Sequence, residues 1–379
     1  MYIERSLMPV LKKHLFQGKI IVIYGARQVG KTTLVKKMLE DCGETYKYLN
    51  CDEFDIQDLF SNAKTSSQLR EILGGQRLIV LDEAQRVRNI GIKLKLINDN
   101  FPDLQVIATG SSSFDLSNDI AEPLTGRNFE FWLHPLSAVE LEQTTSQLEL
   151  NRRLENFLIY GMYPAVIQAD SLDTKTEALK HLAANYLYKD VLKFQNLKNA
   201  EIVRKLLQAL ALQIGHEVSY LELSRLIGVS QQLIAQYIDI LEKVFVIFRL
   251  PPFSRNLRKE ISRSRKIYFY DLGIRNALIN NFNPLALRSD IGNLWENFCI
   301  AEKMKQQLGL AYQSNFYFWR TYDQQEIDFI EEKGGKLFAS EMKWSDRKTK
   351  IPVAFQDSYP NAEWQVVDRQ NYIQFLKGV

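Results

Sequence analysis

Short apolar runs and amphipathic segments alternate along the first third of the chain. Three apolar runs, 19–24, 78–83 and 105–109, are predicted to be buried strands because they are short and rich in β-branched residues. The segment 33–39 has its apolar residues at helical spacing. Strands that alternate with helices form a parallel sheet with helices on both faces. We therefore predict an α/β fold with a parallel-sheet core over residues 1–135.

The pattern changes after residue 135. From 136 to 213 the strand pattern fades, and stretches such as 179–187 have the apolar spacing of a helix. The segment Gly161-Met162-Tyr163-Pro164 interrupts this block once. A helical subdomain that follows a parallel-sheet core can act as a lid over it, so we predict a helical lid over 136–213.

The next block has the pattern of a helix-turn-helix. Residues 220–226 predict a short helix and 230–243 a longer amphipathic one, with Gly228 in the turn between them and Ser230 as a favourable N-cap. The buried side of the longer helix is expected to contain Leu233, Ile234, Tyr237, Ile238 and Leu241. The apolar run at 244–250 and the strand-like segment at 266–270 could form the β-wing behind these helices. We predict a winged helix-turn-helix over 214–275.

The C-terminal block, 276–379, begins with an amphipathic helix and continues as strands. The helix is predicted over 290–308, with Leu294, Phe298, Ile300 and Ala301 on its packed side. Strand patterns follow at 316–320, 325–330 and 336–344, and Gly334-Gly335 fits a hairpin turn between the last two.

One loop of the core carries a phosphate-binding pattern. The run Gly25-Ala26-Arg27-Gln28-Val29-Gly30-Lys31-Thr32, continued by Thr33, satisfies G-x-x-x-x-G-K-[ST] between a predicted strand and a predicted helix. Backbone N–H groups of such a loop and the helix N-terminus hold phosphates. Lys31 is expected to reach the β- and γ-phosphates, and the Thr32 hydroxyl to complete a Mg²⁺ shell. We predict that the chain binds a nucleoside triphosphate, with ATP and Mg²⁺ as cofactors.

Hydrolysis needs further groups near the phosphates. Asp82 and Glu83 end the second strand, where Asp82 would hold Mg²⁺ through water and Glu83 would polarise the attacking water. Ser111, in Gly110-Ser111-Ser112-Ser113, could sense the γ-phosphate or orient the water, or belong to a simple turn. Arg127 could neutralise charge as an arginine finger, in cis or on a neighbouring copy, or be a surface charge.

Composition excludes several classes of protein. The chain has 379 residues, 46% of them hydrophobic, which favours two or three folded domains. Its longest apolar runs are far shorter than the roughly 20 residues of a membrane helix. Its start lacks the charged, apolar and small-residue segments that follow one another in a signal peptide. Three scattered cysteines and four distant histidines suggest no metal cluster and reduced thiols. We expect a cytoplasmic protein without a membrane partner.

Charge is uneven along this chain of net charge +3. The segment 244–275 has eight basic residues and two acidic ones. The basic residues are Arg249, Arg255, Arg258, Lys259, Arg263, Arg265, Lys266 and Arg275. Such a segment beside a winged helix is suited to contacts with the DNA backbone. The alternative is a solvated loop and a winged helix that packs only between domains, because the second helix has Gln231, Gln232 and Gln236 but a single lysine.

The C-terminal strands carry a candidate metal site. Asp328 follows Ile327 on one strand, while Glu341 and Lys343 are two residues apart on the next and so share a face. With Glu296 on the preceding helix, this order of residues fits metal-assisted phosphodiester cleavage, in which Asp328 and Glu341 bind metal and Lys343 stabilises charge. Alternating charges on a half-exposed strand are the ordinary alternative.

Several stretches together resemble a known group of proteins. They are Gly25–Thr33, Leu81-Asp82-Glu83-Ala84-Gln85, Thr109-Gly110-Ser111-Ser112, Leu124-Thr125-Gly126-Arg127, Gly161-Met162-Tyr163-Pro164-Ala165-Val166, Trp295-Glu296-Asn297 and Glu326-Ile327-Asp328-Phe329. The chain resembles, over nearly its full length, bacterial and archaeal AAA-type ATPases in which a P-loop core precedes a C-terminal domain of unknown function. One departure is Met162, where the group would have a second glycine.

The resemblance implies an AAA-like core, a winged helix and a PD-(D/E)XK, restriction-endonuclease-like C-terminal domain. It assigns nucleotide roles to Lys31, Thr32, Asp82 and Glu83. It assigns the nuclease-like site to Glu296, Asp328, Glu341 and Lys343.

Two functions of different classes follow from the sequence. The first is an ATP-hydrolysing motor or switch that engages DNA and gates the C-terminal metal site. The second is a regulatory ATPase whose degraded nuclease-like domain docks a protein. A P-loop kinase would need an acceptor pocket that the sequence does not indicate, and homo-oligomerisation is left open.

Overall fold

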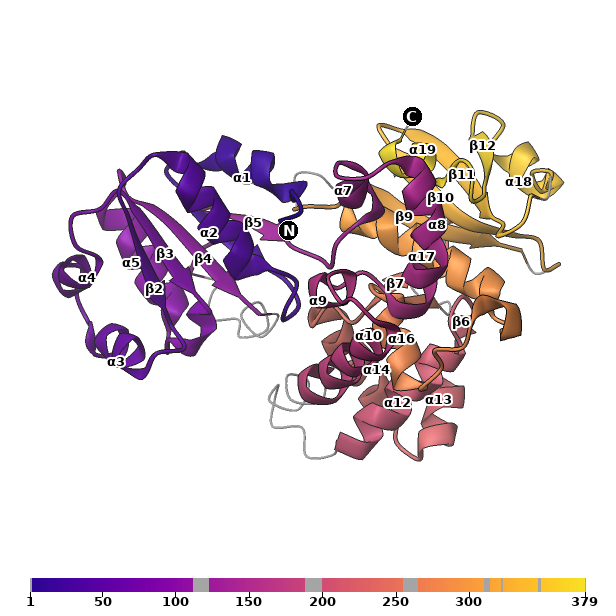
Figure 1. The fold of residues 1–379 in the computed structure, drawn as a ribbon, viewed down its shortest axis with the longest axis horizontal. Coiled ribbons are helices and arrows are strands. Elements are labelled where there is room, and N and C mark those ends of the chain that lie inside the picture. The colour runs from indigo at the N-terminus through magenta and orange to yellow at the C-terminus, as the bar shows by residue number, and fades with distance from the viewer. Residues whose placement is uncertain are drawn as a thin grey trace.

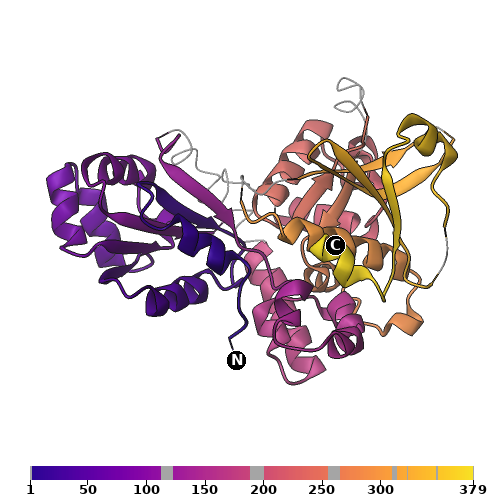
Figure 2. The same cartoon turned by 90° about the horizontal axis from the view of Figure 1, so that it is seen from above.

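The computed structural model describes residues 2–111, 123–187, 200–254, 265–309, 314–321, 323–346 and 349–378. Within these residues the strands form three sheets. Figures 1 and 2 show the N-terminal sheet with its helices as one lobe, and the remaining helices and two sheets as a second lobe. No described helix is both long enough and apolar enough to span a membrane.

The N-terminal sheet is parallel throughout. Its strands are β1 (Ile20–Tyr24), β2 (Tyr46–Asn50), β3 (Leu78–Asp82), β4 (Gln105–Gly110) and β5 (Asn128–Trp132), in the order β2-β3-β4-β1-β5. β1 and β3 are buried at every position, as central strands covered on both faces should be. This sheet confirms the predicted α/β fold class.

Helices cover both faces of this sheet. They are α1 (Leu7–His14), α2 (Lys31–Cys42), α3 (Phe54–Asn62), α4 (Ser66–Leu73) and α5 (Ile90–Asn100), with a short turn η1 (Ala84–Arg86) after β3. Ile21 and Ile23 share a buried cluster with residues of α1 and α2. Ile20 and Val22 belong to the other cluster, with residues of α3, α4 and α5. The alternation follows from the period of two in a strand.

Helices follow the core, as predicted. They are α7 (Ala138–Glu142), α8 (Gln147–Tyr160), α9 (Pro164–Ile167), α10 (Leu172–His181), the π-helix η2 (Leu182–Leu187) and α12 (Ala200–Leu212). Gly161 has a φ of +70°, and a Cβ there would lie 2.1 Å from the Asp271 Oδ1. The neighbouring Met162 N–H donates to Asp271 Oδ2 at 2.7 Å. Met162 itself is buried without a positive φ, so no second glycine is needed at this bend.

The next elements run helix, strand, helix, helix, strand, strand. After α12 come β6 (Glu217–Val218), α13 (Tyr220–Ile227), α14 (Gln231–Lys243), β7 (Ile247–Leu250) and β8 (Arg265–Phe269). The three strands form an antiparallel sheet in the order β6-β8-β7. The Ser230 hydroxyl accepts a hydrogen bond from the Leu233 N–H at 3.2 Å and so caps α14. Of the expected buried side of α14, Leu233 is half-buried and the other four residues are buried.

The C-terminal elements complete the second lobe. They are α16 (Leu272–Leu278), η4 (Leu285–Leu287), α17 (Ile291–Lys305), β9 (Asn315–Arg320), β10 (Glu326–Lys333), β11 (Lys336–Met342), α18 (Val353–Ser358), β12 (Glu363–Val367) and α19 (Tyr372–Lys377). The sheet has the order β12-β11-β10-β9, with β12 parallel to β11 and the other pairs antiparallel. Gly334 and Gly335, both with positive φ, turn the chain between β10 and β11 as predicted.

Candidate nucleotide site and acid–lysine cluster

The phosphate-binding pattern lies between the buried strand β1 and the first turn of α2. Gln28 and Gly30 have positive φ values of 61° and 99°, which direct successive backbone groups of the loop inward. A Cβ at Gly25 would lie 2.1 Å from the Leu133 carbonyl oxygen. Packing against the segment after β5 therefore requires glycine at this end of the loop.

The Lys31 side chain lies against the loop itself. It is 5% exposed, and its Nζ donates to the carbonyl oxygens of Gly25 at 2.9 Å and Ala26 at 3.0 Å. Both are hydrogen bonds from a charged donor to neutral acceptors. A phosphate oxygen is a stronger acceptor for this ammonium group because it carries charge, so Lys31 is placed to exchange these bonds for a phosphate.

Asp82 gathers three hydroxyl groups at the end of β3. Thr32 Oγ1 donates to Asp82 Oδ2 at 2.7 Å, and the hydroxyls of Tyr48 and Thr109 also donate to this carboxylate. Burial, followed by the hydrogen bond to Asp82, raises the pKa of Tyr48 well above its ordinary value. Carboxylate and hydroxyl oxygens are the ligands that Mg²⁺ prefers in proteins. Thr32 and Asp82 therefore fit the magnesium position beside a bound triphosphate.

Glu83 is joined to Ser111 through a glutamine. Glu83 has a φ of 54°, and its Oε2 accepts a hydrogen bond from Gln85 Nε2 at 2.5 Å. The same Nε2 lies 3.0 Å from Ser111 Oγ, to which it donates. Sequence reasoning gave Gln85 no role, although it belongs to one of the recognised stretches. Ser112 and Ser113, the other hydroxyls of that stretch, lie outside the described residues.

A cavity of about 640 Å³ opens over the phosphate-binding loop. The loop and Glu83 line one side of it, and Tyr2 and Ile3 line it from the chain's start. Pro164 and Ala165 of α9 face it as well, together with Gln168 just after that helix. Two residues of the stretch Gly161–Val166, Pro164 and Ala165, therefore form part of the wall of this cavity.

Arg5 donates a hydrogen bond to the phosphate-binding loop, a role that sequence reasoning missed. Its guanidinium group is almost fully buried and donates to the carbonyl oxygens of Val29 at 2.8 Å and His134 at 2.6 Å. Its Nε is 3.1 Å from Glu140 Oε1. A lone arginine ahead of the first strand has no sequence signal, because its partners are 24, 129 and 135 residues away.

Arg127 lies at the opposite edge of the sheet from the phosphate-binding loop. Its carbonyl oxygen accepts a hydrogen bond from the Ile20 N–H, at the start of β1, whereas the loop follows the end of β1. The length of β1 separates them, roughly 13 Å at about 3.3 Å per residue. The Arg127 Nε pairs with Asp99 at 2.7 Å. A finger in cis therefore does not fit this position, and only action on a neighbouring copy stays a prediction.

The four predicted C-terminal residues lie in one group with further charges. We call the group the acid–lysine cluster; its members are Lys266, Glu296, Glu326, Asp328, Glu341 and Lys343. Lys343 Nζ is 2.6 Å from Glu341 Oε1, as the period of two predicts. The Met342 N–H donates to Asp328 Oδ2 at 2.8 Å. Sequence reasoning missed the roles of Lys266 and Glu326.

Burial and like charges shift the pKa values of the cluster's carboxyl groups. Burial, together with the charge of Glu296, raises the pKa of Asp328 to about 7. Burial and the charge of Asp328 raise the pKa of Glu341. For Lys266, burial lowers the pKa, but Glu296, Asp328 and Glu326 outweigh it and raise the pKa overall. The lysine therefore stays charged among the carboxyl groups.

Divalent metal does not fit this cluster as it stands. Among the residues that the structure describes, no three acidic, histidine or cysteine side chains converge as metal ligands. The Lys266 ammonium group lies between Glu296 and Glu326. Asp328 and Glu341, the predicted metal ligands, lie near enough for the charge of Asp328 to raise the pKa of Glu341, and their role as metal ligands stays a prediction.

The described basic residues of segment 244–275 are mostly engaged inside the protein. Arg249 pairs with Asp239 at 2.6 Å and with Glu242. Arg275 is buried and pairs with Asp290 at 2.7 Å, and Lys266 belongs to the acid–lysine cluster. Arg255, Arg258, Lys259 and Arg263 lie outside the described residues. Ion pairs within the protein thus engage three of the basic residues expected at this surface.

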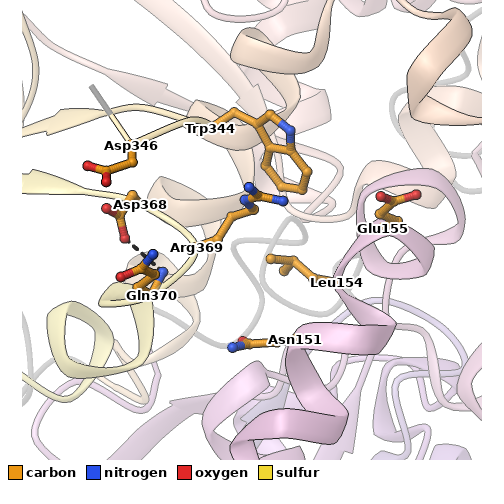
Figure 3. Close-up of a pocket in the computed structure, with 8 residues that line it drawn as sticks. All are labelled: Asn151, Leu154, Glu155, Trp344, Asp346, Asp368, Arg369 and Gln370. Atoms are coloured by element: carbon orange, nitrogen blue, oxygen red, sulfur yellow. Dashed lines mark hydrogen bonds between the residues drawn. The ribbon is translucent and has the colours of Figure 1, made fainter.

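A second cavity, of about 290 Å³, lies between α8 and the segments after β11 and β12. Figure 3 shows the Arg369 guanidinium group between Trp344 and Leu154, and it lies 4.8 Å from the centre of a Trp344 ring. Acidic residues Glu155, Asp346 and Asp368 also line this cavity. No residue predicted as a site from the sequence lines it.

Three family models match consecutive parts of the chain. Residues 17–142 match an AAA domain. Residues 151–285 match a domain of unknown function, DUF8612, and residues 291–373 match another, DUF4143. The AAA match and the geometry around Lys31 and Asp82 support an AAA-type P-loop ATPase.

Relatives are similar along most of the chain. The uncharacterized protein Rv2008c of Mycobacterium tuberculosis is 26% identical over 90% of this chain and 74% of its own length. The uncharacterized protein MJ1544 of Methanocaldococcus jannaschii is 25% identical over 96% of this chain and 80% of its own. Among solved structures, the Walker-type ATPase of Pyrococcus abyssi is 13% identical, covers 73% of this chain and 96% of its own, and has a TM-score of 0.48.

Proposed function

We propose that the N-terminal lobe binds and hydrolyses ATP. The observation that carries this proposal is the hydrogen bond of 2.7 Å between Thr32 and Asp82, next to the buried Lys31 ammonium group. Parallel pairing puts the ends of β1 and β3 at one edge of the sheet. The loop, Thr32 and the Glu83 carboxylate thus line one cavity, and Asp82 accepts the Thr32 hydrogen bond beside it.

Each residue would have a separate task in hydrolysis. The loop amides and Lys31 would hold the β- and γ-phosphates. Thr32 and Asp82 would hold Mg²⁺, which when bound neutralises phosphate charge. Glu83 would orient a water molecule for attack on the γ-phosphate and accept its proton. Gln85 and Ser111 would fix the position of Glu83 from the side.

Calorimetry with ATP and Mg²⁺ tests the binding step. Lys31→Ala should abolish measurable binding, because it removes the one buried ammonium group on the loop. The matched control is Lys37→Ala on the same helix. Lys37 pairs with Glu40 at 3.0 Å, so this variant should bind ATP normally. Folded wild-type protein that releases no heat with ATP would refute the proposal.

We also propose that residues 214–275 form a winged helix that contacts DNA. Its support is the element order α12-β6-α13-α14-β7-β8 with the antiparallel sheet β6-β8-β7 and the exposed Gln231, Gln232 and Gln236 on α14. Glutamine side chains can bond to base edges. The internal pairing of Arg249 and Arg275 leaves fewer charges for the DNA backbone.

Fluorescence anisotropy with a labelled DNA duplex tests this contact. Replacing Gln232 and Gln236 together by alanine should weaken binding at least about tenfold, and the control Gln356→Ala on α18 should not. Wild-type affinity should fall between about 50 and 200 mM salt because phosphate contacts release ions. No binding at low salt, with ATPase activity intact, would favour the regulatory ATPase with a protein-docking C-terminal domain.

We propose four domains along the chain, of which the first two follow the predicted boundaries. Residue 135 lies between β5 and α7, and residue 213 lies just after α12. The predicted boundary at 275 falls inside α16 (Leu272–Leu278), so we place it after that helix. Limited proteolysis between 279 and 290 would support this division.

A further inference from the structure

The acid–lysine cluster is centred on a lysine that comes from outside the C-terminal sheet. Lys266 lies on β8 and is only 2% exposed. Its Nζ is 2.9 Å from Glu296 Oε1 on α17 and also forms an ion pair with Glu326 at the start of β10. One ammonium group therefore joins three elements that are far apart in the sequence.

Neighbouring groups hold this arrangement in place. The Tyr268 hydroxyl, two residues along β8, donates to the same Glu296 Oε1 at 2.6 Å. Lys266 Nζ also lies 5.6 Å from the centre of the Phe318 ring on β9, a distance at which a ring face attracts a cation. A buried carboxylate is costly unless it is paired and hydrogen-bonded, and Glu296 has both kinds of partner.

A divalent cation would compete for the same carboxylates. Mg²⁺ needs oxygen ligands at about 2.1 Å, with little tolerance for other geometry. The buried Lys266 ammonium group repels such an ion, and it already pairs with Glu296 and Glu326 of the same cluster. The described residues accordingly show no convergent set of three metal ligands.

We propose that Lys266 is the resident cation of the acid–lysine cluster and takes the position that a divalent metal would occupy. The cluster then joins the β6-β8-β7 sheet to α17 and the C-terminal sheet, and it does not cut DNA. Glu341 Oε2 is the buried cluster oxygen that lacks a hydrogen-bond partner. It marks where a metal would bind if this inference were wrong.

Manganese provides the test, because free and bound Mn²⁺ differ in their electron paramagnetic resonance signal. We would titrate the nucleotide-free full-length protein and its Glu341→Gln variant. The same number of bound Mn²⁺ ions in both is expected. Loss of one ion per chain in Glu341→Gln would overturn the proposal, and this comparison does not disturb Lys266.

Removal of the lysine gives the complementary measurement. Lys266→Met keeps the length of the side chain without its charge and should gain one bound Mn²⁺ per chain. This ion should be lost again when Glu341→Gln is added. The matched control is Lys303→Met, which removes a different buried lysine, paired with Glu331 at 3.2 Å, and should gain none.

Two further results would refute the inference. One is a folded Lys266→Met protein that binds no additional Mn²⁺. The other is nicking of plasmid DNA by the wild-type protein in Mn²⁺ that disappears in Lys343→Ala. If Lys266→Met does not fold, the number of Mn²⁺ ions bound by the wild type and by Glu341→Gln decides whether the cluster holds a metal.

Discussion

His134 is a titratable side chain buried where the two lobes meet, and its replacement tests how acid loosens this contact. It is 5% exposed and stacks on Tyr270 with a ring distance of 4.7 Å. The Phe245 ring packs edge-on at 5.7 Å. Burial, with smaller effects from Lys305 and Arg5, lowers the pKa of the His134 imidazole to about 3.

The sign of the effect follows from this lowered pKa. The folded state keeps the imidazole neutral, while the unfolded state binds a proton below its ordinary pKa of about 6.5. His134 therefore contributes stability that is present above about pH 6.5 and is lost as the pH falls toward 3. Between about pH 7.5 and pH 5 the loss is about 2 kcal/mol, because each pH unit below the unfolded-state pKa corresponds to about 1.4 kcal/mol.

The variant His134→Phe keeps an aromatic ring and cannot titrate. Nδ1 of His134 in the wild type has no hydrogen-bond partner, so the substitution should be tolerated at neutral pH. The free energy of unfolding is measured in urea for both proteins at the two pH values. The wild type should lose about 2 kcal/mol more than the variant. Equal losses, within about 0.5 kcal/mol, would refute a neutral buried His134.

Further predictions concern the nucleotide site and its surroundings. Gly161→Ala should lower the free energy of unfolding by roughly 2–4 kcal/mol, measured in urea, because a Cβ would lie 2.1 Å from Asp271 Oδ1 at a φ of +70°; a smaller loss would mean that Asp271 moves freely. Glu83→Gln should reduce ATP turnover at least about 10²-fold while ATP still binds, and normal turnover would assign the water to another residue. Arg127→Ala should change the turnover of dilute protein less than about twofold, since a finger contributes about 10³–10⁵ only when it reaches the phosphates. A large loss that appears only in concentrated protein, where copies associate, would show action in trans.

The local features of the nucleotide site could be predicted from the sequence alone. The strand at 19–24, the glycine loop and the helix after it are contiguous, and their geometry depends on backbone conformation at a few glycines. The strand at 78–83 likewise ends in Asp82 and Glu83 by covalent order. Parallel strands put their carboxyl ends at one edge of a sheet, so these two regions had to meet once the fold class was known.

The tertiary structure decided the features that depend on which distant elements pair. Arg127 follows a recognisable motif, yet the pairing of β5 with β1 puts it at the amino edge of the sheet. Lys266 is one of eight basic residues in a segment that looked like a DNA-binding surface, but packing of β8 on α17 buries it beside Glu296. The sequence gives the charge of such a residue through its identity. Its partner depends on long-range packing, because an ammonium group enters the interior only where the fold supplies carboxylates to pair with it.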